Sequence, residues 1–159
     1  MDPRKHLELI VRPNMAALAK DAADIRHAFN AAAAIDALVA HIYWWAVEHA
    51  RDKINPRKGD DAYRHRLGEK SRDVRLTLEV ARANKHSKLD RGKPTVLAAG
   101  KVAARNFWWD DYAQFDDAHL DFPMQVAIAS TDAGGYEVAE AIFRRALTFL
   151  ECEMTVLGI

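Results

Sequence analysis

The sequence has a single cysteine, Cys152, and lacks any long apolar run. One cysteine excludes a disulfide within the chain and is typical of a reducing compartment. No apolar stretch approaches the roughly 20 residues that a helix needs to cross a bilayer. The first residues carry only a short apolar patch without a small-residue cleavage pattern, so we expect no signal peptide. These absences predict a soluble cytoplasmic protein that does not associate with membranes.

The sequence also has no excess of charge of one sign. Lys and Arg number 23 and Asp and Glu number 23, so the formal net charge is zero. The whole molecule therefore exerts no general attraction on nucleic acid, although the sequence still allows a local basic patch. Half of the 159 residues are apolar, which is ordinary for a globular protein. A chain of this length fits one domain that buries a core without metal or disulfide staples.

The few prolines and glycines, 5 and 7 in number, mark the limits of long helical segments. Residues 14–54 contain neither and are rich in alanine, which predicts one long helix, or two if Asn30 interrupts it. We expect this segment to start at Pro13-Asn14, with Asn14 as the cap. The stretch "NPRKGDD" ends it, and a second long helix is predicted over residues 61–88.

The pattern changes after the second helix. The stretches "TVLAAGKVAAR" and "FPMQVAIAS" are typical of strands, and they predict an antiparallel hairpin over residues 95–131 with a long aromatic and acidic loop. A final helix is expected over residues 136–157, where apolar residues recur at helical spacing. The prediction is a mostly α protein. It is a single domain, a bundle of long antiparallel helices with a small antiparallel β-hairpin before the C-terminal helix.

A polar stripe runs along the predicted helix 61–88. At about 100° per residue, Arg75, Glu79, Arg82 and His86 share one narrow face with apolar residues on both sides, as at a groove or an interface. One interpretation is a weakly stabilising ladder of ion pairs through Arg75, Glu79 and Arg82. The other is a reactive site, in which His86 transfers a proton and Arg82 stabilises an anion.

A carboxylate lies in the middle of an apolar helical face, at Asp36. A buried carboxylate is costly unless it meets a cation or several hydrogen-bond donors. Arg82 and His86 are the natural candidates, and Asp36 would then orient them. The alternative is that Asp36 bonds only tyrosine or backbone donors inside the bundle.

On the opposite side of the same helix, His41, Trp45 and His49 form a stripe beside Glu48. Imidazoles and a carboxylate suit zinc or iron. However, Trp45 stands between the two histidines, and no HExxH or paired ExxH motif completes a cage. We therefore expect no metal ion and no other cofactor, and interpret the stripe as a packing or dimer face. The tryptophans that would strengthen such a contact are Trp44, Trp45, Trp108 and Trp109.

The helix "NAAAAIDALVAHIYWWAVEH", followed by a second long helix ending in "RANKH", resembles the HEPN-type helical families of prokaryotic defence and toxin systems over residues 25–90. The resemblance implies a helical bundle, a homodimer and a metal-independent ribonuclease. In those families the motif is an arginine, often a polar residue after it, then roughly four to six residues and a histidine, and the arginine and histidine lie at the dimer cleft. Arg82 and His86 are the match here, with only three residues between them, and Asn84 supplies the polar amide.

Two hypotheses from different classes follow. In the first, the chain is a binding or accessory module. Its Asp36, Arg82 and His86 form a structural network, and its tryptophan-rich surfaces bind a protein partner or a second subunit. We favour this hypothesis because the net charge is zero and the spacing from Arg82 to His86 is short.

In the second hypothesis the chain is a ribonuclease. His86 would exchange a proton with a ribose 2′-hydroxyl or with the leaving oxygen, and Arg82 would stabilise the phosphate. Asp36 would hold one of the two. The expected contacts to RNA are Arg75, Asn84 and Lys85.

Overall fold

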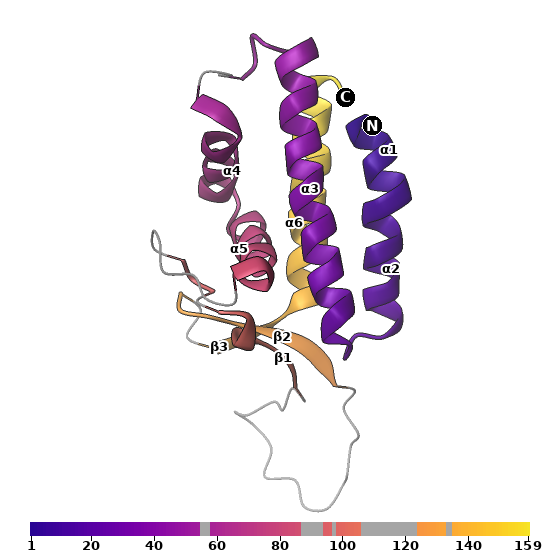
Figure 1. Cartoon of the computed structure of the whole chain (residues 1–159), viewed down its shortest axis with the longest axis vertical. Coiled ribbons are helices and arrows are strands. Elements are labelled where there is room, and N and C mark those ends of the chain that lie inside the picture. Colours follow the sequence, from indigo (N-terminus) through magenta and orange to yellow (C-terminus); the bar gives the residue numbers. More distant parts are fainter. Residues whose placement is uncertain (55–57, 87–93, 97, 106–123, 133–134) are drawn as a thin grey trace, which may run out of the picture.

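The computed structural model describes residues 1–54, 58–86, 94–96, 98–105, 124–132 and 135–159. It shows a mostly helical protein with a small antiparallel sheet ahead of the last helix (Figure 1), which confirms the predicted fold class. Among the residues described, no helix has the length and apolar character that spanning a membrane requires.

The chain begins with three helical parts in unbroken succession: α1 (Pro3–His6), the π-helical η1 (Leu7–Val11) and α2 (Arg12–Lys20). The expected helix start at Pro13 is therefore wrong, because the chain is already helical there. Pro13 has no N–H and its ring crowds the preceding turn. The preceding turn is widened, and Asn14 does not cap but donates from Nδ2 to the carbonyl of Ile10 at 2.8 Å.

The break in the segment 14–54 lies between α2 and α3 (Ile25–His49), and Asn30 lies inside α3. Asp24 caps α3 by accepting a hydrogen bond from the N–H of Arg26 at 2.8 Å. The side chain and the backbone N–H of Arg26 together lower the pKa of Asp24 to about 2. This cap sets where the long central helix begins.

The expected single helix over 61–88 is two helices, α4 (Gly59–Lys70) and α5 (Arg72–His86). Ser71 between them is extended, with φ −139°. Its hydroxyl accepts a hydrogen bond from the N–H of Val74 at 3.3 Å, as an N-cap does. The break changes the direction in which the side chains of α4 point relative to those of α5.

The sheet has three strands in the order β1-β2-β3: β1 (Val102–Arg105), β2 (Gln125–Ser130) and β3 (Gly135–Val138). A 3-10 turn, η3 (Ala99–Lys101), precedes β1. The third strand extends the predicted hairpin, and it occupies the first residues of the expected helix 136–157. That helix, α6 (Ala139–Leu157), therefore begins at Ala139. The aromatic loop with Trp108 and Trp109 lies outside the described residues.

The helix α3 runs through the middle of the bundle, with α6 behind it, α1 and α2 on one side, and α4 and α5 on the other (Figure 1). The sheet lies across one end of the bundle. The core forms where α3, α5 and α6 meet, because all three present apolar faces to one another. Its fully buried side chains include Ile35, Ile42, Leu76, Val80, Phe143 and Leu150.

Candidate functional site

Asp36, on α3, is buried with 8% of its surface exposed, as its place on an apolar face predicts. Arg64 on α4 donates from Nη1 to one carboxylate oxygen of Asp36 and from Nη2 to its backbone carbonyl, the latter at 3.2 Å. Lys85 on α5 donates from Nζ to the other carboxylate oxygen at 3.3 Å. Two cations from two helices therefore satisfy the buried charge.

The network continues from Arg64 to a second carboxylate. Arg64 Nε donates to Asp60 Oδ2 at 3.0 Å, one helical turn earlier on α4. The other oxygen of Asp60 is buried and has no hydrogen-bond partner among the described residues. Lys85, Asp36, Arg64 and Asp60 thus alternate in sign and join α3, α4 and α5. Such an arrangement offsets the desolvation of each charge by its neighbours.

The expected pairing of Asp36 with Arg82 and His86 is wrong. Both side chains are exposed near the end of α5. No hydrogen bond or ion pair joins either of them to Asp36, whose carboxylate is held by Arg64 and Lys85. The physical reason is the break before α5, which leaves Arg64 on α4 facing the carboxylate. Asn84 is exposed as well, so the end of α5 presents Arg82, Asn84 and His86 to solvent.

The expected ion-pair ladder on α5 is also wrong. Glu79 is buried with 7% of its surface exposed, and it pairs with neither arginine. Its Oε2 accepts from the N–H of Thr95 at 2.9 Å, from the Thr95 hydroxyl at 2.6 Å and from the N–H of Val96 at 2.8 Å. Glu79 therefore anchors the backbone that leads to the sheet. Arg75 instead donates to Asp132 at 2.8 Å.

A second charge cluster fastens the start of α5 to the sheet. Arg72 Nη2 donates to Glu137 at 2.6 Å, to Asp132 at 2.9 Å and to the hydroxyl of Ser130 at 3.1 Å. The Arg72 guanidinium lowers the pKa of Asp132 to about 2, and the same contacts raise the pKa of Arg72. Arg72 and Arg75 are thus engaged in holding the fold together, and Arg75 shares its acidic partner with Arg72.

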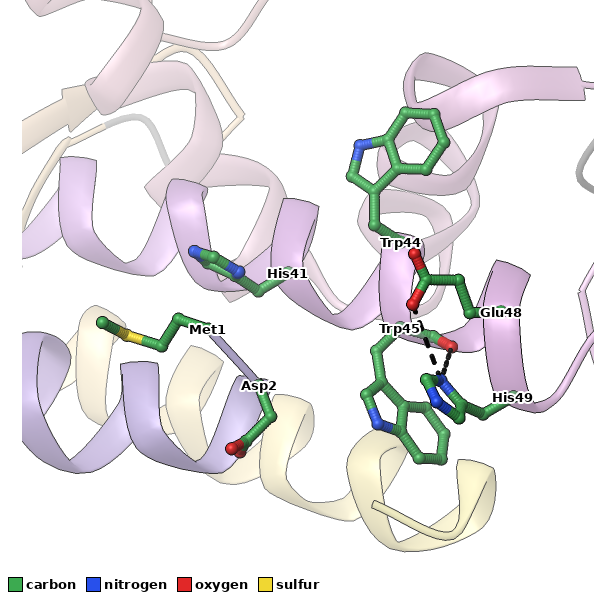
Figure 2. A pocket seen from close by; sticks show the side chains of 7 residues that line it. All are labelled: Met1, Asp2, His41, Trp44, Trp45, Glu48 and His49. Atoms are coloured by element: carbon green, nitrogen blue, oxygen red, sulfur yellow. Dashed lines mark hydrogen bonds and ion pairs between the residues drawn. The ribbon is translucent and has the colours of Figure 1, made fainter.

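The predicted stripe of His41, Trp45 and His49 borders an open pocket of about 450 Å³ between α3 and the first residues of the chain (Figure 2). The indole of Trp44 stands at its rim, and 57% of that residue is exposed. Because Trp45 lines the same pocket, aromatic surface is gathered at this place rather than scattered singly. The lining consists of Met1, Asp2, His41, Trp44, Trp45, Glu48 and His49.

The histidines of this pocket are engaged with protein groups. The rings of His41 and His6 lie 4.4 Å apart, and burial, together with the charge of His6, lowers the pKa of His41. The ring of His49 stacks on Trp45 at 4.7 Å, and its Nδ1 lies 3.0 Å from the carbonyl of Trp45. Within the part of the chain that the structure describes, no group of three or more His, Cys, Asp or Glu residues could hold a metal ion.

Arg64 and Asp60 are the members of the Asp36 network that the sequence analysis missed. Their signal is local, since an aspartate and an arginine at i, i+4 on one helix form an ion pair. The residues Met1 and Asp2 of the pocket carry no such signal, because they approach α3 only through the fold.

No family model, no curated protein and no solved structure matches the chain.

Proposed function

We propose that the chain is a binding or accessory module that contacts a protein partner, a second copy of itself included, through the α3 surface around Trp44. The observation that carries this proposal is the exposed indole of Trp44 at the rim of a pocket that Trp45 also lines. Tryptophan is enriched at protein interfaces and among the residues that contribute most to binding. Burying this indole under a partner would remove a large apolar area from water.

The charge network supports an architectural role for Asp36. Both of its carboxylate oxygens are occupied, one by Arg64 and the other by Lys85. A group that orients a catalytic histidine must hydrogen-bond to it, and Asp36 bonds to no histidine in the part of the chain that the structure describes. His86 therefore has no carboxylate from this network to set its tautomer or to raise its basicity.

Site-specific photocrosslinking tests the proposed contact surface. A photoreactive phenylalanine analogue at position 44 is expected to give a discrete crosslinked species in cells that produce the protein. The same analogue at position 156 is the control, because Val156 on α6 is also an exposed apolar residue. The readout is the set of crosslinked bands on a denaturing gel. The proposal fails if position 44 gives no band, or gives the same bands as position 156.

A second candidate function, a HEPN-type ribonuclease, is favoured by one observation. Arg82 and His86 are both exposed and lie one helical turn apart on α5. In this hypothesis His86 would transfer a proton and Arg82 would stabilise the phosphate charge.

The two functions differ in their effect on RNA. The binding module is expected to leave labelled RNA intact in the presence of a chelator. A ribonuclease would cleave it, and His86→Ala would lower the rate by about 100-fold or more. The matched control is His65→Ala, which removes an exposed histidine of α4 and would leave the rate unchanged. Chelator-resistant cleavage that His86→Ala abolishes and His65→Ala preserves would replace the first proposal with the second.

A further inference from the structure

We infer that the pocket on α3 takes the side chain of a lysine or arginine from the protein partner. This inference depends on the proposed function, which makes the surface around Trp44 the contact surface. It adds the chemical class of what enters the pocket: an organic cation on an apolar stem.

One carboxylate of the pocket, that of Glu48, has no ion pair with a lysine or arginine side chain among the described residues. The Glu48 side chain is 71% exposed, and its one ion contact within the described residues is with His49, at 4.0 Å. The Asp2 carboxylate accepts from the backbone N–H of Lys5 at 3.0 Å, and this bond, with the charges of Lys5 and of the Met1 amino group, lowers its pKa. Neither carboxylate forms an ion pair with any lysine or arginine side chain that the structure describes.

His41 does not supply a positive charge at neutral pH. The pKa of His41 is lowered by burial and by His6, so its ring is neutral. The amino group of Met1 lies close enough to contribute to the lowered pKa of both His41 and Asp2. Asp2 therefore has cationic groups near it, whereas Glu48 presents an exposed carboxylate to the pocket. An anionic ligand such as an RNA phosphate is therefore disfavoured and a cation is favoured.

The aromatic rings of the lining suit the stem and the head of a basic side chain. Figure 2 shows the indoles of Trp44 and Trp45 projecting from α3 on different sides of Glu48. Indole faces attract ammonium and guanidinium groups and pack against aliphatic stems. The volume of about 450 Å³ lies in the range of small-molecule pockets, so it holds a whole side chain with part of its backbone.

A titration of the full chain with two short peptides tests the inference. The probes are acetyl-Gly-Arg-Gly-amide and the same peptide with citrulline, which keeps the shape of arginine without its charge. The measurement follows the indole N–H signals of Trp44 and Trp45 by NMR, assigned with single tryptophan variants. We expect the arginine peptide to shift these signals with a Kd in the millimolar range. The citrulline peptide should bind about fivefold more weakly.

A matched pair of variants locates the charge that matters. Glu48→Gln is expected to weaken the arginine peptide by about threefold. Glu69→Gln is the control, because Glu69 on α4 is also an exposed carboxylate whose ion contact is a histidine, His65. Equal binding of the two peptides would overturn the inference, as would unchanged binding after Glu48→Gln. An RNA oligonucleotide that shifts the same indole signals would also overturn it.

Failure of this inference is distinguishable from failure of the proposed function. A crosslink specific to position 44, with equal binding of the arginine and citrulline peptides, would reject the inference of a cationic side chain but retain the proposed contact surface. Absence of that crosslink removes both.

Discussion

Replacing Asp36 with alanine is expected to lower the free energy of unfolding by about 3 kcal/mol. The loss arises because Arg64 would remain in a largely buried position without its main partner. The two side chains are only 12% and 11% exposed, so solvent screens their interaction weakly. Urea unfolding of the purified variant, followed by circular dichroism, measures the change.

Two controls separate the buried network from ordinary surface charge. Glu8→Ala removes an exposed ion pair with Arg12 and should change the stability by no more than about 0.5 kcal/mol. Asp36→Ala combined with Arg64→Ala should cost less than the sum of the two single changes, because the contact between Asp36 and Arg64 is counted in both single losses and neither residue then remains without the other. A loss below about 1 kcal/mol for Asp36→Ala would show that the network does not stabilise the fold.

Replacing Glu79 with alanine is expected to lower the free energy of unfolding by about 2 to 3 kcal/mol. One oxygen of Glu79 accepts from two backbone N–H groups and one hydroxyl, in Thr95 and Val96. Removing it leaves the buried N–H of Val96 and the partly buried donors of Thr95 unsatisfied, and a buried donor without a partner costs about 1 kcal/mol or more. Urea unfolding gives the total, and amide hydrogen exchange at Thr95 and Val96 shows where protection is lost.

Glu79→Gln provides the matched comparison, because glutamine keeps one acceptor oxygen and nearly the same volume. It should recover part of the lost stability and part of the exchange protection. Glu69→Ala, an exposed position on α4, should have little effect. If Glu79→Ala loses no protection at Thr95 and Val96, the anchoring role assigned to Glu79 is wrong.

The burial of Asp36 could be predicted from the sequence because the helical period alone places it among apolar neighbours. Its partners could not, since they depend on how α4 and α5 are turned relative to α3. The break at Ser71 makes α4 and α5 separate helices. The direction of the Arg64 side chain on α4 therefore does not follow from the helical periodicity of α5. The sequence does carry a signal for that break. Ser71 stands three residues before Val74 with Asp73 in the first turn, a pattern typical of a helix start.

Glu79 shows a different limit of prediction. Its spacing from Arg75 and Arg82 is that of an exposed ladder, and the periodicity is the same whether solvent or another segment covers it. What buries it is the backbone of Thr95 and Val96, which returns to α5 from a distant part of the sequence. Helical periodicity describes one element at a time, so it does not show which segments far along the chain will cover a face.

The strands β1 and β2 were predictable as two short strand-like segments that form an antiparallel hairpin. They pair in this way, with Val102 opposite Ile128. The third strand was not, because "GYEV" borders helix-favouring sequence and is only four residues long. The stripe of His41, Trp45 and His49 on one side of the pocket was predictable from the sequence, but as a packing or dimer face and not as a pocket. Its wall of Met1 and Asp2 was not, because nothing local predicts that the first residues pack there.

The wide turn at η1 determines which side chains of the N-terminal helical segment face the bundle. Four of this segment's buried residues, Pro3, Leu7, Val11 and Met15, recur every four positions, whereas a regular α-helix repeats every 3.6. The π-helical turn at η1 takes up one additional residue. It offsets the angular drift that a four-residue spacing accumulates along an α-helix. Deleting one residue from η1 would therefore restore a regular helix but rotate Pro3 and His6 by about 100° away from the bundle. The contact between His6 Nε2 and the Ala34 carbonyl, at 3.2 Å, would be lost with that rotation.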